Sequence, residues 1–557
     1  MSLAENVQSS TENGNPTHFD AIVVGAGFGG LSMLHELRNM DLNVKVLESA
    51  EDVGGTWYWN RYPGARTDSE SWYYSTYSFA KEIKDEWNWS ERYPAQPEVL
   101  RYLQFVTDRL DLRKDIQFNT HVEHATYDEP SGQWFVTTRD GSNYTARYFI
   151  LAVGIVSHPY VPPFPGLDKF QGEHYVTSRW PHEPVDLAGK RVVVIGTGAT
   201  SVQLLPIIAH TVEHVTVLQR TPNYVLPARN YALTGEQQHA IRRDHAEIFD
   251  NARNHFFGMP FTTAERSADE VPSQDWHRVL DGGWEVGGFR YLFETFNDIL
   301  VNEKSNELAA EFIRNKIRAV VKDPKTAELL CPKNYPLGGK RPPLGHLYYE
   351  TFNRDNVELV DVSETPIEEI TANGLRVGDT EYEADVLIFA TGFDAMTGAA
   401  SHIDIRGRNG ITIKEKWEDG PRSYLGMTVD EFPNMFMVCG PQTPFANIPL
   451  VIEICVDWIR DTIAHLRTEG IGAIEATAAA SDSWTQYMDE LVQQTILHKG
   501  RHAWFMGDNI PGKRRVVLVH FGGIDVYQRE CDQVRDRGFE GFALSGSNSP
   551  AEAVSPA

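Results

Sequence analysis

Three glycines near the start of the chain, Gly25, Gly27 and Gly30, have the spacing of a turn that can approach a phosphate group closely. They follow the apolar run 19–24, and leucines recur after them at helical spacing. A strand, a glycine turn and a helix in this order direct the first main-chain N–H groups of the helix toward a pyrophosphate. Glu48 ends the next apolar run, where a carboxylate can accept hydrogen bonds from ribose hydroxyls. Together these residues predict a dinucleotide site.

A second glycine loop repeats the arrangement at Gly196 and Gly198, with Ser201 in the place of the third glycine. The apolar run that follows it ends in Arg220 and Thr221 instead of a carboxylate. An arginine can bind a phosphate through two parallel charged hydrogen bonds, whereas a carboxylate would repel it. This site is therefore expected to prefer NADPH to NADH. The alternative is that Arg220 is a solvated residue at a strand end.

The link between the two loops carries a pattern of four residues: Phe170, Gly172, Trp180 and Pro181. It resembles the fingerprint of type I Baeyer–Villiger monooxygenases, flavoenzymes that insert one oxygen atom of O2 beside a ketone carbonyl. The family has a histidine where this chain has Val176, and His174 lies two residues earlier. If the segment is extended, these two side chains face the same side, roughly 6.5 Å apart. His174 is then expected to replace the missing histidine only in part; the alternative is that position 176 tolerates valine.

A second stretch, residues 54–68, is similar throughout to another signature of this family and includes Thr56, Trp57 and Asp68. The resemblance extends over about residues 19–528. It implies that NADPH reduces FAD, that O2 adds at flavin C4a, and that the resulting peroxide attacks a ketone to give an ester or lactone. Such a reaction needs a site that excludes water and holds a positive charge near the anion.

The family's arginine for that charge lies in a Lys-Arg-Pro motif, which falls at Lys340 and Arg341 in this chain. By this resemblance Arg341 is the catalytic candidate, and Asp68 is the carboxylate that orients it. A carboxylate beside a buried guanidinium holds its geometry and offsets the cost of burying the charge. Lys340 matches a residue that helps Arg220 and Thr221 bind the 2′-phosphate of NADPH. As a bare dipeptide, Lys-Arg would more often belong to a solvated loop.

Two late segments extend the resemblance. Trp504 matches a tryptophan placed against the nicotinamide half of the cofactor and the substrate pocket, with a packed core aromatic as the alternative. The loop 440–449 resembles the compact substrate-facing loop of cyclohexanone monooxygenases, with Phe445 and Ile448 as apolar wall. Such a wall suits a cyclic or aliphatic ketone.

Two other functions stay open on the sequence. An N- or S-oxygenating flavin monooxygenase would act on amines or sulfides with the same two nucleotide sites, although Trp180 and the signature 54–68 are not typical of that class. A sensor would bind FAD and NADPH without turnover. It would have no need of a buried Arg341 oriented by Asp68.

The elements that carry these residues predict an α/β fold with two interleaved Rossmann-like dinucleotide-binding domains and a helical insert. The runs 149–154 and 385–392 resemble the crossings between the domains of two-nucleotide flavoproteins. Residues 228–328 lose the strand pattern, and periodic stretches such as 293–308 favour helices. The expected boundaries are 18–155 and 390–545 for the FAD domain, 156–227 and 329–389 for the NADPH domain, 228–328 for the insert, and 1–17 and 546–557 for disordered tails.

Composition restricts the partners. A formal net charge of −26 argues against a nucleic-acid surface, which needs a basic face. The sequence has no run of about 18 apolar residues, so no membrane span is expected. Four cysteines without a C-x-x-C pair fit a reducing compartment such as the cytoplasm and argue against a zinc site or a redox-active disulfide. We expect a monomer or weak homo-oligomer whose partners are a small ketone and O2.

Overall fold

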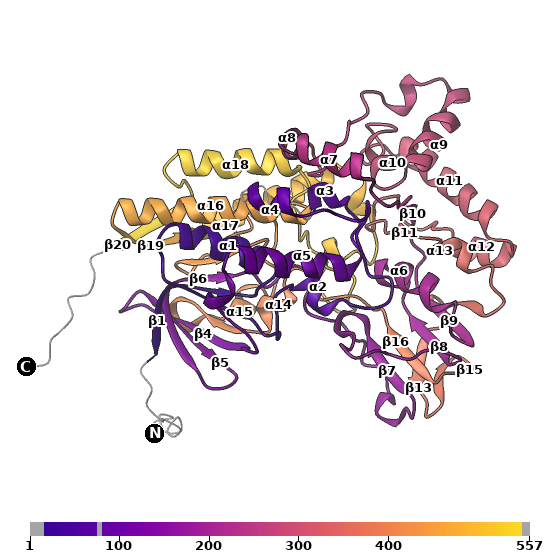
Figure 1. Cartoon of the computed structure of the whole chain (residues 1–557), viewed down its shortest axis with the longest axis horizontal. Coiled ribbons are helices and arrows are strands. Elements are labelled where there is room, and N and C mark those ends of the chain that lie inside the picture. Colours follow the sequence, from indigo (N-terminus) through magenta and orange to yellow (C-terminus); the bar gives the residue numbers. More distant parts are fainter. Residues whose placement is uncertain (1–15, 75–80, 548–557) are drawn as a thin grey trace, which may run out of the picture.

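The computed structural model describes residues 16–74 and 81–547. Two parts lie side by side, each built on a β-sheet, and a helical region extends from one of them (Figure 1). Each sheet contains a strand that leads through a glycine turn into a helix. The predicted α/β class with two Rossmann-like units is confirmed.

The first part contains eight strands: β1 (Thr17–Val24), β2 (Val44–Leu47), β3 (Ile116–Gln117), β4 (Val122–Asp128), β5 (Gln133–Thr138), β6 (Asn143–Leu151), β17 (Asp404–Arg406) and β18 (Met435–Met437). They pair in the order β17-β4-β5-β6-β1-β2-β3, and β18 also pairs with β6. The central strands β1, β2 and β6 are parallel and largely apolar because both faces of the sheet are covered.

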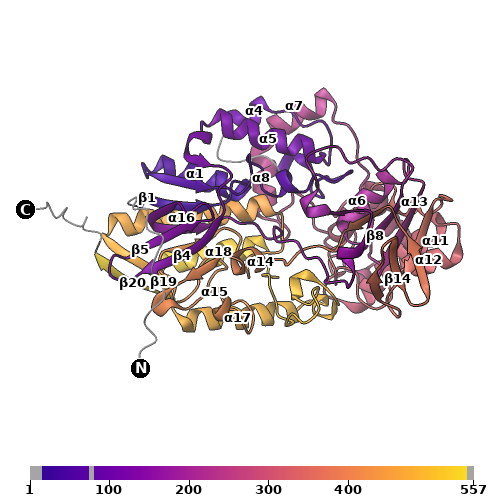
Figure 2. The same cartoon turned by 90° about the horizontal axis from the view of Figure 1, so that it is seen from below.

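Helices cover this sheet on both sides. Those of the first part are α1 (Phe28–Asn39), α2 (Thr56–Trp59), α3 (Ser71–Tyr74), α4 (Lys81–Glu86), α5 (Gln96–Arg109), α14 (Gly398–Ser401), α15 (Ile413–Lys416), α16 (Ile448–Thr468), α17 (Ala478–Gln493) and α18 (Ile524–Asp536). α1 packs against α16. Figure 2 shows α5 and α17 on opposite sides of this part. A two-stranded antiparallel sheet of β19 (Ile471–Ala476) and β20 (Phe542–Ser547) lies at its edge.

The second part is a parallel five-stranded sheet of β7 (Glu173–Val176), β8 (Arg191–Ile195), β9 (His214–Gln219), β12 (Val357–Asp361) and β16 (Val386–Phe389). Its order is β12-β9-β8-β16-β7. Helix α6 (Ala199–Ile208) follows β8, and α13 (Tyr348–Thr351) packs against α6. An antiparallel sheet of β13 (Ile367–Ile370), β14 (Gly374–Val377) and β15 (Thr380–Glu383) is inserted before β16.

The helical region follows β10 (Leu226–Pro227), which pairs with β11 (Leu344–Gly345). It comprises α7 (Gly235–Arg243), α8 (His245–Arg253), α9 (Trp276–Val286), α10 (Arg290–Phe293), α11 (Glu303–Val320) and α12 (Pro324–Leu330). The periodic stretch 293–308 is not one helix, which corrects the prediction. The reason is a cap: the side chain of Asn302 accepts hydrogen bonds from the main-chain N–H groups of Lys304 and Ser305 and starts α11 there.

The chain passes between the two sheets twice, and the two connections lie against each other. Tyr160 N donates to Gly392 O at 3.0 Å, and Met396 N donates to Ile155 O at 2.8 Å. Because of these crossings, β17 and β18 join the first sheet after the second sheet has been completed along the chain.

Pairing reaches slightly into the segments predicted as tails. Thr17 pairs with Tyr144, and Ser547 pairs with Ile471. The remainder of both predicted tails, apart from residues 16 and 546, lies outside the described residues. Among the described helices, none is both long and apolar enough to cross a bilayer.

Candidate active site

The first glycine loop has the close packing that a phosphate cradle requires. Gly25 links β1 to the turn, Gly27 is the N-cap of α1, and Gly30 lies in the first turn of that helix. A Cβ atom at Gly30 would lie 1.8 Å from the carbonyl oxygen of Gly25, so only glycine fits. A glycine N-cap has no side chain to occupy the first N–H groups of α1, which are therefore available to a pyrophosphate.

Glu48 directly follows β2 next to this loop and is almost fully buried. Its Oε2 accepts a hydrogen bond from Ala26 N at 2.6 Å and its Oε1 accepts one from Ala50 N at 2.8 Å. Burial raises the pKa of Glu48, and these two hydrogen bonds oppose the rise. Glu48 thus holds the glycine loop itself, a role that the sequence analysis missed. Its Oε1 also accepts from Ser49 Oγ at 3.3 Å, whereas Oε2 keeps a second lone pair for a ribose hydroxyl.

The predicted signature 54–68 lies against the same loop. Thr56 opens α2 and is exposed, whereas Trp57 is buried with its ring 6.1 Å from that of Tyr74. Tyr74 also contacts Phe28 of α1, with ring centroids 6.0 Å apart. Burial raises the pKa of Tyr74 to about 12, so its hydroxyl stays protonated.

The second glycine loop repeats this geometry between β8 and α6. Gly196 follows β8 with φ +110°, and Gly198 is the N-cap of α6. A Cβ atom at Gly196 would lie 2.5 Å from the carbonyl oxygen of Ala390. Ser201 is fully buried within α6, where its small side chain stands in for a third glycine.

Two cations gather beside the second loop. Arg220 directly follows β9 and is exposed. Thr197 Oγ1 of the loop donates to Thr221 O at 2.9 Å, which ties the loop to the residue after Arg220. Burial lowers the pKa of Lys340 to about 8; the Arg220 cation adds to this effect and Asp508 opposes it. Two mutually repelling cations at the end of a strand are suited to an anionic ligand.

Arg341 and Asp68 form an ion pair across the junction of the two parts. Arg341 Nη1 donates to Asp68 Oδ2 at 2.7 Å, and the side chain of Asp68 is 5% exposed. Gln203 of α6 donates to the other carboxylate oxygen at 3.2 Å and accepts from the Tyr62 hydroxyl at 2.8 Å. Both oxygens of Asp68 are therefore bonded, which fixes the direction of the guanidinium. Gln203 and Tyr62 were not predicted; a glutamine at an apolar helix position was the available signal.

One aromatic ring lies over the same guanidinium, and three more rings continue from it in a chain of contacts. The guanidinium carbon of Arg341 lies 5.5 Å from the ring centroid of Phe289, which belongs to the helical region. Phe289 contacts Phe257, and Phe257 contacts Phe445, with centroids 5.8 and 5.4 Å apart. Phe445 lies 5.4 Å from Trp504. The structure thus brings the predicted Phe445 and Trp504 together and adds two rings from the helical region.

The rest of the predicted substrate loop turns into α16. Ile448 is the first residue of that helix and is half-buried. Asn447 N, just before it, donates to the carbonyl oxygen of Phe257 at 3.0 Å. The loop and the helical region are therefore fixed to each other at this point.

The fingerprint residues do not gather at Arg341 but line the second sheet. Trp180 is buried and followed by Pro181, and Phe170 packs on the apolar cluster around Phe389. A Cβ atom at Gly172 would lie 2.4 Å from Asp385 O, which explains the glycine. Residues next to this pattern contact the first part: Arg179 lies 4.6 Å from the ring of Trp59 and His182 lies 4.7 Å from that of Tyr58.

The segment that departs from the family pattern is extended, in β7 at the edge of the sheet. Val176 pairs with Phe389 and packs on its cluster, while His174 is exposed and pairs with Leu387. The ring centroid of His174 is 6.4 Å from that of Phe389. Both side chains thus approach the same ring, and the expected substitution of His174 for a histidine at 176 stays a prediction.

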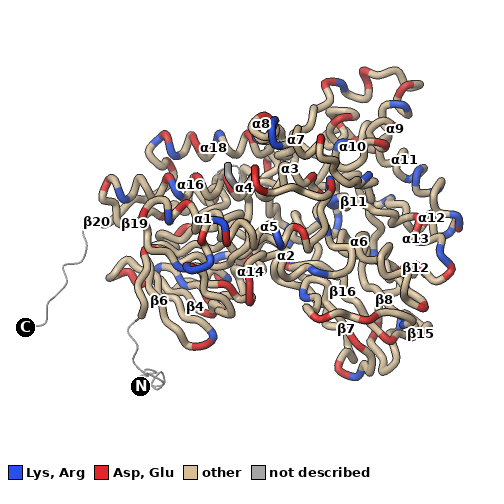
Figure 3. Tube along the Cα trace, viewed as in Figure 1, with Lys and Arg blue, Asp and Glu red and all other residues tan. Residues whose placement is uncertain are grey.

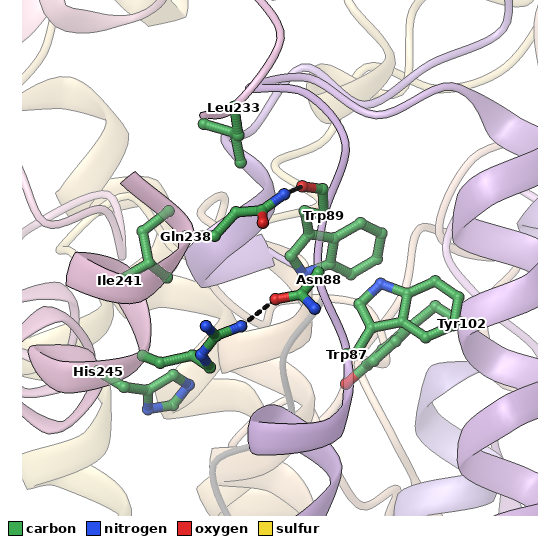
Figure 4. A pocket seen from close by; sticks show the side chains of 9 residues that line it. Trp87, Asn88, Trp89, Tyr102, Leu233, Gln238, Ile241 and His245 are labelled. Carbon is green, nitrogen blue, oxygen red and sulfur yellow. Dashed lines mark hydrogen bonds between the residues drawn. The ribbon is translucent and has the colours of Figure 1, made fainter. Parts of the chain in front are cut away.

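A separate pocket lies between α5 and α7 (Figure 4). Trp87, Trp89 and Tyr102 form one wall, and Gln238 Nε2 donates to the carbonyl oxygen of Trp89 at 2.9 Å. None of its described lining residues is among the predicted site residues. Acidic and basic residues are interspersed over both parts of the chain (Figure 3).

Comparisons with known proteins agree with this geometry. The family model described as Flavin-binding monooxygenase-like matches residues 20–233. A phenazine N-monooxygenase of Lysobacter antibioticus is 44% identical over 96% of this chain and 98% of that protein. The crystal structure of a cyclohexanone monooxygenase from Rhodococcus sp. Phi1 bound to NADP+ matches with a TM-score of 0.93 at 44% identity, over 96% of this chain and 100% of that chain. A Baeyer-Villiger monooxygenase of Pseudooceanicola batsensis is 43% identical over 96% of this chain and 98% of that protein. Identity at this level along nearly the whole of both chains means that this chain belongs to the Baeyer–Villiger monooxygenases.

Proposed function

We propose that this protein uses NADPH and O2 to insert one oxygen atom beside the carbonyl group of a ketone, giving an ester or lactone. The observation that carries the proposal is the ion pair of Arg341 and Asp68 at the junction of the two nucleotide-binding units, with the ring of Phe289 over the guanidinium. An arginine in such a place can stabilise negative charge that develops during oxygen transfer. A pure nucleotide sensor has no use for it.

The cofactors are FAD and NADPH, and the residues present fit both. We propose that Gly25, Gly27, Gly30 and Glu48 hold the adenosine diphosphate half of FAD, with Thr56, Trp57 and Asp68 along its remaining length. The backbone at Gly30 leaves no room for any side chain, and this close approach of the loop supports the proposed FAD site. When bound, FAD supplies the electrons received from NADPH and the activation of O2.

The second loop takes NADPH in this proposal. Gly196, Gly198 and Ser201 let α6 present its first N–H groups to the pyrophosphate. Arg220, Thr221 and Lys340 bind the 2′-phosphate, which the paired cations favour over the uncharged hydroxyl of NADH. Trp504 lies against the nicotinamide half.

The substrate then binds beside Arg341. Phe445, Ile448 and Trp504 form the apolar wall, together with Phe257 and Phe289 from the helical region. Asp68 holds the guanidinium of Arg341 in a fixed orientation, and the aromatic rings exclude water from the substrate site. Such walls suit a cyclic or aliphatic ketone, although one methylene changes discrimination by only about 1 to 3 kcal/mol.

The proposed domain boundaries are drawn from the sequence, and the two sheets support them. We propose that residues 18–155 and 390–545 form the FAD domain, 156–227 and 329–389 the NADPH domain, and 228–328 the insert. The pairing of β17 and β18 with the first sheet supports the return at 390. We further propose a cytoplasmic monomer or weak homo-oligomer, a location supported by four buried free thiols.

A product assay tests the activity. Purified protein with FAD is given NADPH, O2 and a panel of linear, cyclic and polycyclic ketones, and the products are identified by mass spectrometry. Ester or lactone formation with matching NADPH consumption is expected. Phenazine is tested as a second class of substrate, because one relative of 44% identity is named a phenazine N-monooxygenase. N-oxide from phenazine without any ester from ketones would overturn the proposal in favour of N-oxygenation.

A further inference from the structure

Glu70 lies two residues after Asp68 and has no part in the proposed chemistry, yet its side chain is only 1% exposed. Its carboxylate binds two arginines. Arg92 donates to Oε1 from Nη2 at 2.6 Å and from Nε at 2.9 Å. Arg290 donates to Oε1 at 3.5 Å and to Oε2 at 3.4 Å. A carboxylate so fully removed from water is stable only while these charges and hydrogen bonds compensate it.

The two arginines converge on one turn of the helical region. Arg290 is the first residue of α10, and Arg92 Nη1 donates to the carbonyl oxygen of Val286 at 2.8 Å. Val286 is the last residue of α9, where a cation interacts favourably with the free carbonyl groups of the helix. Glu70 therefore fixes both ends of the turn 286–290 from the segment that carries Asp68.

That turn carries Phe289, whose side chain is buried against Arg341. An aromatic face attracts a guanidinium, and the attraction grows as water is excluded. Asp68 binds the same guanidinium at its Nη1. Arg341 is thus held by a carboxylate and covered by a ring, and both depend on the short segment 68–70.

We propose that Glu70 is a positioning residue that, through Arg92 and Arg290, holds the turn 286–290 so that Phe289 covers the guanidinium of Arg341. Glu70 itself touches neither substrate nor cofactor. The proposal rests on the proposed role of Arg341. Without Glu70 the turn is released, and the side chain of Arg341, which is 29% exposed in the structure, becomes more open to water. More NADPH and O2 are then converted to NADP+ and H2O2 instead of oxygenated product.

Glu70→Gln in the full chain, with FAD and NADP+ bound, tests this proposal. Hydrogen–deuterium exchange of residues 286–293 is expected to rise at least about tenfold, because the turn opens locally without global unfolding. Product formed per NADPH is expected to fall at least about threefold, since small displacements near reacting groups cost rate. The rate of anaerobic flavin reduction by NADPH, which does not use this turn, is expected to change less than about twofold.

Asp430→Asn is the matched control. Asp430 has a side chain that is 4% exposed, and its carboxylate binds Lys416 Nζ at 2.5 Å. It lies between α15 and β18, in the part of the structure built on the eight-stranded sheet and outside the insert. The Asp430→Asn variant also loses a buried ion pair. Its hydrogen–deuterium exchange in residues 286–293 and its product per NADPH are nevertheless expected to stay at the wild-type level. If Glu70→Gln does not fold, Arg290→Met gives the same two readouts and leaves the pair of Glu70 and Arg92 intact.

Three results would overturn the proposal: wild-type exchange of residues 286–293 in both Glu70→Gln and Arg290→Met, increased exchange with unchanged product per NADPH, or equal effects in Asp430→Asn. Absence of ester or lactone from the wild-type protein would instead refute the proposed function. The exchange comparison does not depend on that outcome, so the two failures are distinguishable.

Discussion

Gln203 donates a hydrogen bond to Asp68 Oδ1 at 3.2 Å, so the helix that follows the second glycine loop is bonded directly to the carboxylate that orients Arg341. The same amide group also bonds the main chain of Arg66, with Nε2 donating to its carbonyl oxygen at 3.1 Å. A displacement of α6 when NADPH binds must therefore alter the surroundings of Asp68. The two nucleotide units share one hydrogen-bonded junction.

Arg341→Ala is expected to lower ester or lactone formation at least about 100-fold, because the positive charge beside the reacting oxygen is lost. Arg341→Lys keeps a charge but cannot reproduce the planar geometry toward Asp68, so an intermediate rate is expected. Chromatographic product analysis with cyclohexanone, alongside NADPH consumption, measures both. Undiminished product from the alanine variant would rule out the assignment.

The lowered pKa of Lys340, about 8, predicts a pH-dependent preference for NADPH. As the pH rises through that value the ammonium loses its proton, and one charged hydrogen bond to the 2′-phosphate disappears. The KM for NADPH is expected to rise up to about tenfold between roughly pH 7 and 9, whereas the KM for NADH stays flat. Lys340→Arg, whose side chain does not titrate there, serves as the control and should abolish the rise. A parallel rise for NADH would contradict the assignment.

Val176→His restores the histidine of the family pattern at a position paired with Phe389. We expect the ratio of H2O2 to product to fall, because the exposed His174 replaces that histidine only in part. Peroxide and product are quantified in the same reaction. Val176→Thr, which keeps the shape of valine, is the control. An unchanged ratio in Val176→His would mean that position 176 simply tolerates valine.

His255 predicts a loss of stability in mild acid. Burial lowers its pKa to about 4 from 6.5, and its Nδ1 must stay unprotonated to accept from Phe257 N. The unfolded chain binds the proton first as the pH falls below 6.5, so the free energy of unfolding drops between pH 6.5 and about 4, by about 3 kcal/mol at most. His255→Gln should reduce this pH dependence in thermal unfolding. The exposed His239→Gln should leave it unchanged, and an equal reduction in both variants would contradict the prediction.

Local patterns were sufficient to predict the strands that flank the two glycine loops, the loops themselves and the residues that follow β2 and β9, because these depend on neighbours in sequence. The family resemblance, read from residues 54–68 and 170–181, is confirmed by the comparisons. The family resemblance supplied one contact across a long sequence separation, that of Arg341 with Asp68. The other long-range contacts could not be predicted. Gln203 meets Asp68 over 135 residues, and nothing in either segment indicates the other. The covering of Arg341 by Phe289 likewise depends on how the insert packs.

The predicted helix over 293–308 fails for a local reason, since periodicity in apolar residues does not reveal where a capping side chain starts a new helix. The role predicted for Glu48 was incomplete for a similar reason. The sequence places a carboxylate at the strand end but does not show that Ala26 and Ala50 already bond it.

The double passage of the chain between the sheets has a consequence for biosynthesis. Strands β1 to β6 leave the ribosome first, but their partners β17 and β18 are made only after every strand of the second sheet. Until β17 and β18 have been made, the nascent first sheet has unpaired edges at β4 and β6. Such edges can pair with other chains and aggregate. A gene split anywhere between residues 156 and 389 would yield an amino-terminal fragment that needs its carboxyl-terminal complement to close that sheet.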